Sequence, residues 1–188
     1  MLVEKVELES KSAWLLMHPR HTVLVTCVDG EGKPNIITLA WSMVTSFNPF
    51  MVAISVGFGR YSHDLIKTGR EFVVNVPNMD IVGETLFCGR NSGRDADKFA
   101  ETGLTPLAAK HVKPPLIAEC IAHLECKVVN EMTTGDHTLF VGQVVSATVN
   151  EGIFDLGFDP GKIRPILHNG GDDFVTIDPN VVTPSRKL

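Results

Sequence analysis

The sequence lacks the glycine-rich signatures that mark the commonest nucleotide-binding folds. Neither G-x-G-x-x-G nor G-x-x-x-x-G-K-[ST] occurs in its 188 residues, which removes the strongest sequence evidence for a dinucleotide fold or a P-loop. G-x-S-x-G is also absent, and no cysteine can be paired with one of the seven histidines from sequence distance alone. Hydrolytic chemistry therefore has no positive support, and any nucleotide must be held in another way.

Cysteine is scarce and scattered. Cys27, Cys88, Cys120 and Cys126 form no C-x-x-C pair, which in a cytosolic chain indicates reduced, mostly buried thiols and not a disulfide scaffold. Cys120-x-x-His123-x-x-Cys126 contains ligand types that zinc prefers. However, strand periodicity puts His123 on the face opposite both cysteines, and no fourth ligand stands nearby in the sequence. We predict no metal site here.

Long apolar runs and an excess of positive charge are also missing. Lys plus Arg number 17 against 22 for Asp plus Glu, a formal net charge of -5, so we expect neither nucleic acid nor an anionic membrane as a partner. The opening stretch, MLVEKVELES, carries two glutamates by position 7, and we expect no secretory signal, no membrane-spanning helix and a cytoplasmic location. With 44% hydrophobic residues the chain can bury one core, which predicts a single domain over residues 1–188.

The chain does contain a series of short β-rich segments separated by turns. Residues 120–129 show the clearest alternation, with a period of two. Pro49 is expected to end a strand ladder within the loop 46–49. Strands are predicted at 22–28, 35–44, 51–56, 72–76, 120–129 and 138–149.

Helices are predicted to be few and short. Ser62 is expected to cap a helix over 62–69, and Asn78 to cap a second helix that Gly89 terminates. Shorter helical stretches are expected at 11–17 and 95–102. Six or more strands with a few short helices between them favour a mainly β fold, an antiparallel barrel with appended helices, over a parallel doubly wound sheet.

Polar residues interrupt an otherwise apolar strand in NIITLAWSM. Buried polar side chains need partners, so Asn35 and Thr38 either face a ligand or have the ordinary roles of a turn cap and a strand residue. Trp41 is equally open between core packing and a wall for a planar ligand. The residues alone do not choose between these alternatives.

Several longer stretches resemble one known family. N-x-x-T-x-A-W from Asn35 is followed by S-x-x-x-x-F-N-P-F-M-V-A-I-S-V, and then by TGREFVVNVP, SGRDADKF and GDHTLFVG in that order. Together these stretches lie between Pro19 and Thr148, and their order and spacing are similar to those of flavin reductase-like FMN-binding proteins, with the strongest likeness to flavoredoxins.

The resemblance implies a fold, a cofactor and a set of site residues. The implied fold is a split β-barrel of antiparallel, Greek-key type that binds FMN at a homodimer interface. The implied lining of the flavin ring is Asn35, Thr38, Ala40, Trp41 and Ser42. The implied phosphate ligands are Ser55, Ser62 and Lys98. His137 would complete the site near the ring or phosphate and is the one candidate for a catalytic role, and Phe174 would stack on the partner subunit's flavin. Taken alone, Ser62 reads as a plain helix cap, Lys98 as a solvated helix residue and His137 as a turn residue.

The resemblance also implies a reaction, because FMN itself carries the chemistry and the protein need only bind, orient and tune it. The first hypothesis is reduction of bound flavin by NADH or NADPH, followed by transfer to free flavin, ferric iron or a redox partner protein. The second is a flavoredoxin-like electron carrier that receives electrons from another redox protein and uses no pyridine nucleotide. The third, a flavin-free interaction module, predicts a colourless protein.

Overall fold

The computed structural model describes residues 3–184 and contains one large antiparallel sheet of seven strands in the order β3-β2-β6-β9-β10-β5-β4. The mainly β, antiparallel prediction is confirmed. Strands β3 and β4 form the two edges of the sheet. The short link between them is hydrogen-bonded to β5, since the amide of Ser55 donates to the carbonyl of Trp41 at 2.9 Å. The seven strands are β2 (Val23–Val28), β3 (Pro34–Leu39), β4 (Ser42–Phe47), β5 (Phe50–Gly57), β6 (Glu71–Val76), β9 (Ala122–Thr134) and β10 (His137–Val149).

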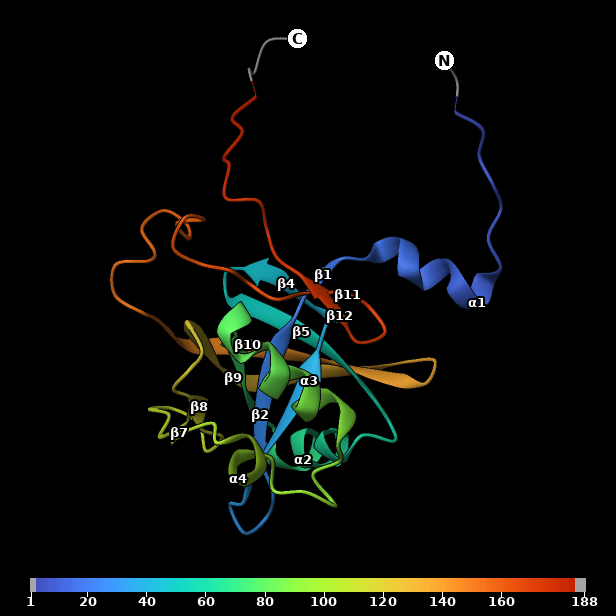
Figure 1. The fold of residues 1–188 in the computed structure, drawn as a ribbon. Coiled ribbons are helices and arrows are strands. Elements are labelled where there is room, and N and C mark those ends of the chain that lie inside the picture. The colour runs from blue at the N-terminus through green and yellow to red at the C-terminus, as the bar shows by residue number, and fades with distance from the viewer. Residues whose placement is uncertain (1–2, 185–188) are drawn as a thin grey trace.

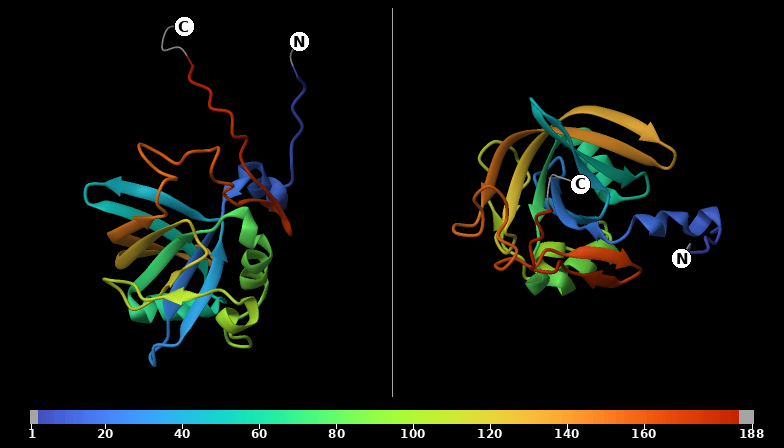
Figure 2. Two further views of the ribbon diagram at one scale, coloured as in Figure 1. Left: turned by 60° about the vertical axis from the view of Figure 1, so that its left-hand side comes forward. Right: turned by 90° about the horizontal axis from the view of Figure 1, so that it is seen from above.

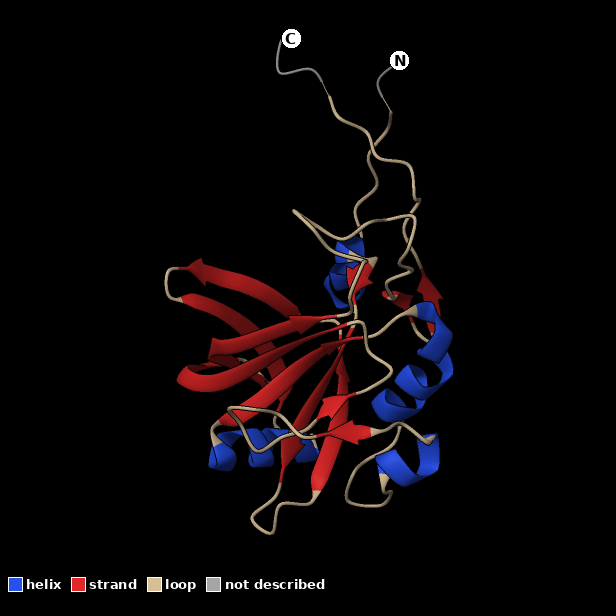
Figure 3. Ribbon diagram, turned by 90° about the vertical axis from the view of Figure 1, so that its left-hand side faces the viewer, coloured by secondary structure: helices blue, strands red, loops and turns tan. Residues whose placement is uncertain are grey.

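Short helices lie outside the strands (Figure 3). Seen from above, the strands form a curved ring, with the N-terminal helix and the C-terminal strand pair outside it (Figure 2). The helices are α1 (Ser10–Ala13), η1 (Trp14–Met17), α2 (Tyr61–Gly69), η2 (Met79–Ile81), α3 (Val82–Arg90) and α4 (Lys98–Thr102). The small strands are β1 (Arg20–His21), β7 (Pro106–Leu107), β8 (Leu116–Ile117), β11 (Leu167–Gly170) and β12 (Asp173–Val175). None of the helices within residues 3–184 is long and apolar enough to cross a membrane.

The core has two parts, one on each face of β2. Inside the barrel, Val25, Ile54, Phe72 and Phe140 are fully buried in the larger apolar cluster. On the outer face, Leu24 belongs to a second cluster that the helices α3 and α4 cover. Because both faces are covered, β2 is buried throughout its length, and Thr26 is its one polar residue.

Several boundaries differ from the sequence predictions, and the strand expected at 120–129 runs from Ala122 to Thr134. The expected strand 35–44 is two strands, because the chain turns at Ala40 and Trp41. The expected loop 46–49 is shorter, since β4 continues to Phe47 and only two residues separate it from β5. Helix 95–102 begins only at Lys98.

The predicted helix caps also differ. Helix α2 begins one residue before Ser62, and its N-cap is Arg60. It ends at Gly69, and the C-cap after it is Arg70 in the left-handed conformation, with φ 58°. Gly89 lies inside α3, where an added Cβ would be 3.2 Å from the Cβ of Thr38, so its lack of a side chain lets the helix approach β3. Asn78 precedes a 3-10 helix without capping it, and its side-chain oxygen accepts from the amide of Arg164.

The polar face of β9 is buried by the connection between β7 and β9. His123 donates from Nε2 to the carbonyl of Ile117 at 2.9 Å, and burial lowers the pKa of this imidazole, which favours its neutral form. Glu125 accepts from the amides of Lys110 and His111 at 3.2 and 2.6 Å. Strand β9 therefore keeps its predicted period of two, but over this stretch both faces are covered. All four cysteine thiols are buried.

Candidate functional site

A cavity of about 560 Å³ lies where the barrel edge formed by β3 parts from β5. Cavities of this size hold small-molecule ligands and cofactors. Its lining comes from β3, the link before β4, the end of β5, the start of α2, α3 with the segment after it, the first residue of α4, and segments near both ends of the described chain. The cavity is thus assembled by tertiary contacts between segments far apart in the sequence.

One end of the cavity is cationic and deep. Gly59, Arg60, Tyr61 and Ser62 line it consecutively as the chain enters α2, and the N-terminus of a helix favours bound anions. Ser62 is only 2% exposed, and its hydroxyl accepts a hydrogen bond of 2.7 Å from the side-chain amide of Asn35. The hydroxyl proton of Ser62 is left to donate to a ligand.

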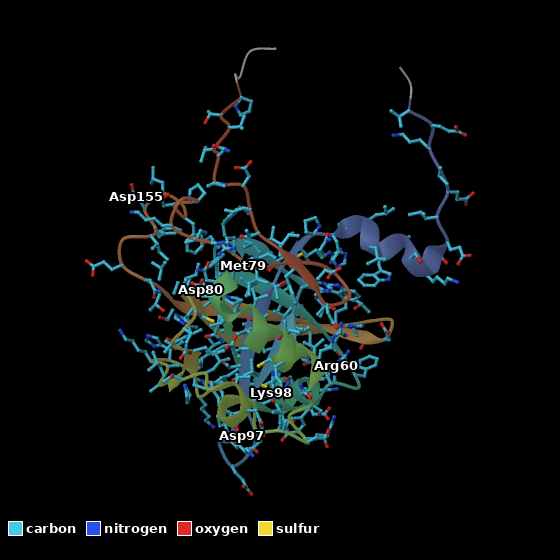
Figure 4. All side chains as sticks on the ribbon, in the orientation of Figure 1. Arg60, Met79, Asp80, Asp97, Lys98 and Asp155 are labelled. Carbon is cyan, nitrogen blue, oxygen red and sulfur yellow. The ribbon has the colours of Figure 1, made fainter. Side chains whose placement is uncertain are left out.

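Lys98 supplies a buried cation at the same end. It is 5% exposed, and its ammonium donates to the carbonyls of Ile36 at 2.6 Å and Cys88 at 2.7 Å. Burial lowers the pKa of Lys98, and the nearby charge of Arg60 acts in the same direction. An ammonium has three donors, so one remains for an anion. Arg60 and Lys98, both labelled in Figure 4, come from the starts of α2 and α4.

The open edge of β3 offers backbone groups to a ligand. Strand β3 pairs with β2 on one side only, and alternate residues of an edge strand turn their N–H and C=O groups away from the partner. Because the carbonyl of Ile36 faces Lys98, the backbone of Thr38 faces the same open side. The Thr38 hydroxyl is engaged elsewhere, since it donates to the carbonyl of Thr85 in α3 at 2.6 Å.

The opposite end of the cavity is flat and aromatic. The rings of Trp41 and His137 lie with centroids 4.8 Å apart and planes 31° apart. Nδ1 of His137 donates to the carboxylate of Asp136 at 2.7 Å, and this hydrogen bond lowers the pKa of Asp136. Nε2 of His137 lies beside Gly57, where an added Cβ would be only 3.4 Å away. The rings of Trp41 and His137 therefore offer a flat surface to a planar ligand, and the hydrogen bond to Asp136 holds the His137 ring in place.

Segments near the two ends of the chain complete the cavity wall. Trp14 packs edge-on against His18, His18 against His168, and the His168 ring contacts Phe174 at a centroid distance of 5.6 Å. Of these four rings, Trp14, His168 and Phe174 line the cavity. Both described ends of the chain leave the barrel on this side (Figure 1).

The structure brings nine of the ten predicted site residues to this one cavity. Ser42 is the exception, because it begins β4 in register with Ile54 and does not line the cavity. Phe174 lines the cavity of its own chain, whereas the sequence resemblance places it against a partner's flavin. The nine residues are Asn35, Thr38, Ala40, Trp41, Ser55, Ser62, Lys98, His137 and Phe174.

Sequence reasoning missed several lining residues. Arg60 could have been found, because it immediately precedes a helix that begins near a predicted phosphate ligand. Trp14 and His168 carry no local signal, since they reach the cavity only through the packing of β1 against β11. Gly93 is recognisable only in the structure, where it approaches Asn35 so closely that an added Cβ would lie 2.1 Å from Oδ1.

A comparison with known protein families identifies the family to which this chain belongs. The model of the flavin reductase like domain matches residues 15–167. The chain belongs to this family. The matched range contains the strands β2 to β10. Of the cavity-lining residues discussed so far, Trp14, His168 and Phe174 lie outside it.

Individual relatives of this flavin reductase-like domain cover nearly its whole length. A protein of Archaeoglobus fulgidus is 41% identical over 161 residues, which are 85% of this chain and 89% of that protein. The structure of a flavoredoxin from Methanosarcina acetivorans superposes with a TM-score of 0.86 at 27% identity, covering 98% of this chain and 97% of that one. An FMN-binding protein from Thermus thermophilus with bound 1-cyclohex-2-enone shares the split-barrel fold, with a TM-score of 0.82 at 22% identity and coverages of 98% and 100%.

Proposed function

We propose that this flavin reductase-like domain binds FMN and transfers electrons through it. The observation that carries the proposal is one cavity with a buried cationic end at Ser62 and Lys98 and a flat aromatic end at Trp41 and His137. FMN has matching chemistry, since a phosphate dianion stands at one end and a planar heterocycle with donors and acceptors at the other. The T. thermophilus relative is itself an FMN-binding protein.

Different lining residues would contact different parts of FMN. Ser62, Lys98 and Arg60 would hold the phosphate with charge-assisted hydrogen bonds, together with the amides at the start of α2. The backbone edge of Thr38 and Ala40 would meet the polar edge of the ring. Asn35 has a positioning role, because its side-chain amide fixes the Ser62 hydroxyl. Lys98 would gain most from the phosphate, since a nearby anion restores the charged form that burial disfavours.

When bound, FMN supplies the capacity to accept two electrons with a proton and to release them singly or in pairs. The chain contributes orientation, exclusion of water from the deep end and a proton-bearing imidazole. The Asp136 carboxylate holds His137 with Nδ1 as donor, so Nε2 is the atom free to exchange a proton at the cavity. His137 is therefore our candidate for a catalytic role.

The leading reaction is reduction of the bound flavin by NADH or NADPH, followed by transfer to free flavin, ferric iron or a partner protein. The cavity extends past the flat end to Trp14, His168 and Phe174, which offer aromatic surface to a second planar ring. The test is anaerobic addition of NADH or NADPH to the FMN-loaded protein. Loss of the flavin absorbance within seconds supports the reductase, and an unchanged spectrum over an hour contradicts it.

A flavoredoxin-like electron carrier is the second candidate, favoured by the 27% identity to the M. acetivorans flavoredoxin over nearly the whole chain. A carrier holds stoichiometric FMN through purification and is reduced by dithionite but not by pyridine nucleotides. A reductase that uses flavin as a substrate releases it on gel filtration. The buried free thiols accord with a reducing cytoplasm, which we retain as the proposed location.

A homodimer is the proposed assembly. Edge strand β4 exposes apolar side chains on both faces, with Met43 58% and Val44 54% exposed, and Phe47 at its end is 90% exposed. Unpaired edge strands with apolar faces are normally covered. The link that precedes β4 carries Trp41, so a second copy seated on β4 would lie beside the cavity. A twofold contact of this kind would cover both cofactors of the dimer.

A further inference from the structure

A second cavity of about 330 Å³ adjoins the cationic end of the first. Asn35, Tyr61 and Gly93 line both cavities and therefore form the partition between them. On the far side, the second cavity is lined by Lys33 and Arg94 among others. The partition stands where the phosphate of a bound mononucleotide would end.

Close packing seals the partition. The backbone of Gly93 lies against Asn35 and Tyr61, since an added Cβ would be 2.1 Å from Oδ1 of Asn35 and 3.0 Å from Cδ1 of Tyr61. Any side chain at this position would have to displace Asn35, which holds the Ser62 hydroxyl. The loop 91–97 therefore rests directly on the residues that shape the phosphate end.

Arg94 latches the loop onto α2. Its guanidinium lies 5.1 Å from the centre of the Tyr61 ring, 3.2 Å from the carboxylate of Asp64, and within 3.4 Å of the carbonyl of Gly59, to which it donates. Arg94 lines the second cavity but not the first. Its contacts hold the partition without forming part of the phosphate site.

The other end of the loop is tied down as well. Asp97 caps α4 by accepting from the amide of Ala100 at 3.2 Å, and it faces Lys33 at 3.8 Å. The loop thus spans from the latch at Arg94 to the helix that carries Lys98. Since Ser62 and Lys98 are 2% and 5% exposed, the cationic end is the deep end of the first cavity.

We propose that the loop 91–97, sealed by Gly93 and latched by Arg94, restricts this site to a flavin mononucleotide and excludes the dinucleotide FAD. A terminal phosphate ends at the partition, whereas the second phosphate and adenosine of FAD have to continue beyond it. The cavity behind the partition would receive that extension once the latch is released. This proposal rests on the proposed FMN function and names the residues that set its specificity.

The test compares FMN and FAD binding to the flavin-free full-length protein by isothermal titration calorimetry. The wild type is expected to bind FMN at least about tenfold more tightly than FAD. Arg94→Ala removes a cation–π contact and an ion pair, so the ratio of FMN to FAD affinity is expected to fall by about five- to thirtyfold, mainly through tighter FAD binding. Asp64→Asn weakens the same latch without changing side-chain size and is expected to shift the ratio in the same direction.

Arg164→Ala is the matched control, because Arg164 is an exposed arginine that lines neither cavity. It should leave the ratio unchanged. Equal affinity of the wild type for FMN and FAD overturns the proposal while FMN binding stands, and so does an unchanged ratio in Arg94→Ala. Failure of the wild type to bind either flavin refutes the proposed function as well. If Arg94→Ala does not fold by circular dichroism, Asp64→Asn decides the matter.

Discussion

The ammonium of Lys98 lies 2.6 Å from the carbonyl oxygen of Ile36, so a buried cation joins the first residue of α4 to the open edge of β3. The same ammonium reaches the carbonyl of Cys88 near the end of α3. Two helices and a barrel edge are held by one charged group, which is oriented before any ligand arrives. Preorganised charge of this kind lowers the entropic cost of binding an anion.

Replacement of Lys98 by methionine should separate phosphate binding from ring binding. A hydrogen bond to a charged group contributes about 1.5–3 kcal/mol, so FMN affinity should fall by about ten- to a hundredfold. Riboflavin, which has the same ring but no phosphate, should bind the variant and the wild type within about threefold of each other. Calorimetric titration with both flavins checks this, and an equal loss for FMN and riboflavin would show that Lys98 is purely structural.

The thiol of Cys88 should be nearly inert although it lines the cavity. Burial raises the pKa of Cys88 to about 11 from 9.0, so at pH 8 its thiolate fraction is about a hundredfold below that of an exposed cysteine. Alkylation by iodoacetamide should be correspondingly slow and should accelerate as the pH rises toward 11. Mass spectrometry after timed quenching measures it, with urea-unfolded protein as the fully reactive control. Rapid labelling of the folded protein at neutral pH would contradict the burial of this thiol.

Gly142→Ala should destabilise the barrel. An added Cβ in β10 would lie 2.6 Å from Cζ of Phe72 and 2.9 Å from Cβ of Cys126, both fully buried. Overpacking of a filled core costs about 1–3 kcal/mol, which urea unfolding would measure as a lower free energy of unfolding. Gly30→Ala is the control, since a Cβ at Gly30 meets nothing within 4 Å. Equal stability of the two variants would count against the packing described for Phe72.

Glu125→Ala should loosen the segment that covers β9. The carboxylate accepts from the amides of Lys110 and His111, and loss of these charge-assisted hydrogen bonds should lower the free energy of unfolding by about 1.5–3 kcal/mol. Hydrogen exchange at those two amides should accelerate before global unfolding. Glu101→Ala, on the exposed side of α4, serves as the control. Unchanged exchange at both amides would mean that Glu125 does not anchor the segment.

Phe47→Asp should give a monomer that still folds. Phe47 is 90% exposed at the end of β4, so a charge there costs the monomer little but would oppose burial in a dimer contact. Sedimentation velocity is expected to show a dimer for the wild type and for the control Leu107→Asp, and a monomer for Phe47→Asp. A wild-type monomer would remove the proposed assembly, and a Phe47→Asp dimer would move the interface away from β4.

The strand at 120–129 illustrates how far local pattern reaches. Its period of two correctly set His123 on the face opposite Cys126, because alternation is a property of the extended backbone itself. The placement of Cys120 on the same face as Cys126 was wrong, since Cys120 precedes β9 and belongs to the outer apolar cluster, whereas Cys126 belongs to the cluster inside the barrel. His123 and Glu125 are nonetheless buried, because the segment between β7 and β9 covers them. No periodic pattern in the sequence predicts this covering segment. Likewise, serine is a residue type that often caps helices, yet Ser62 lies inside α2, which begins one residue earlier. Its hydroxyl instead accepts a hydrogen bond from the side-chain amide of Asn35.

The sequence by itself determined the mainly β architecture, the family and nine of the residues that line the cavity, because these are carried by strand periodicity and by motifs within single segments. Only the tertiary structure decided that Trp14 and His168 join them, that Phe174 lines the cavity of its own chain, that Ser42 lines none of it, and that Lys98 is buried between two carbonyls. Ile36 and Lys98 are separated by 62 positions, as are many pairs that shape the site. Contacts across such separations arise from packing a whole barrel around one core, which no local periodicity specifies.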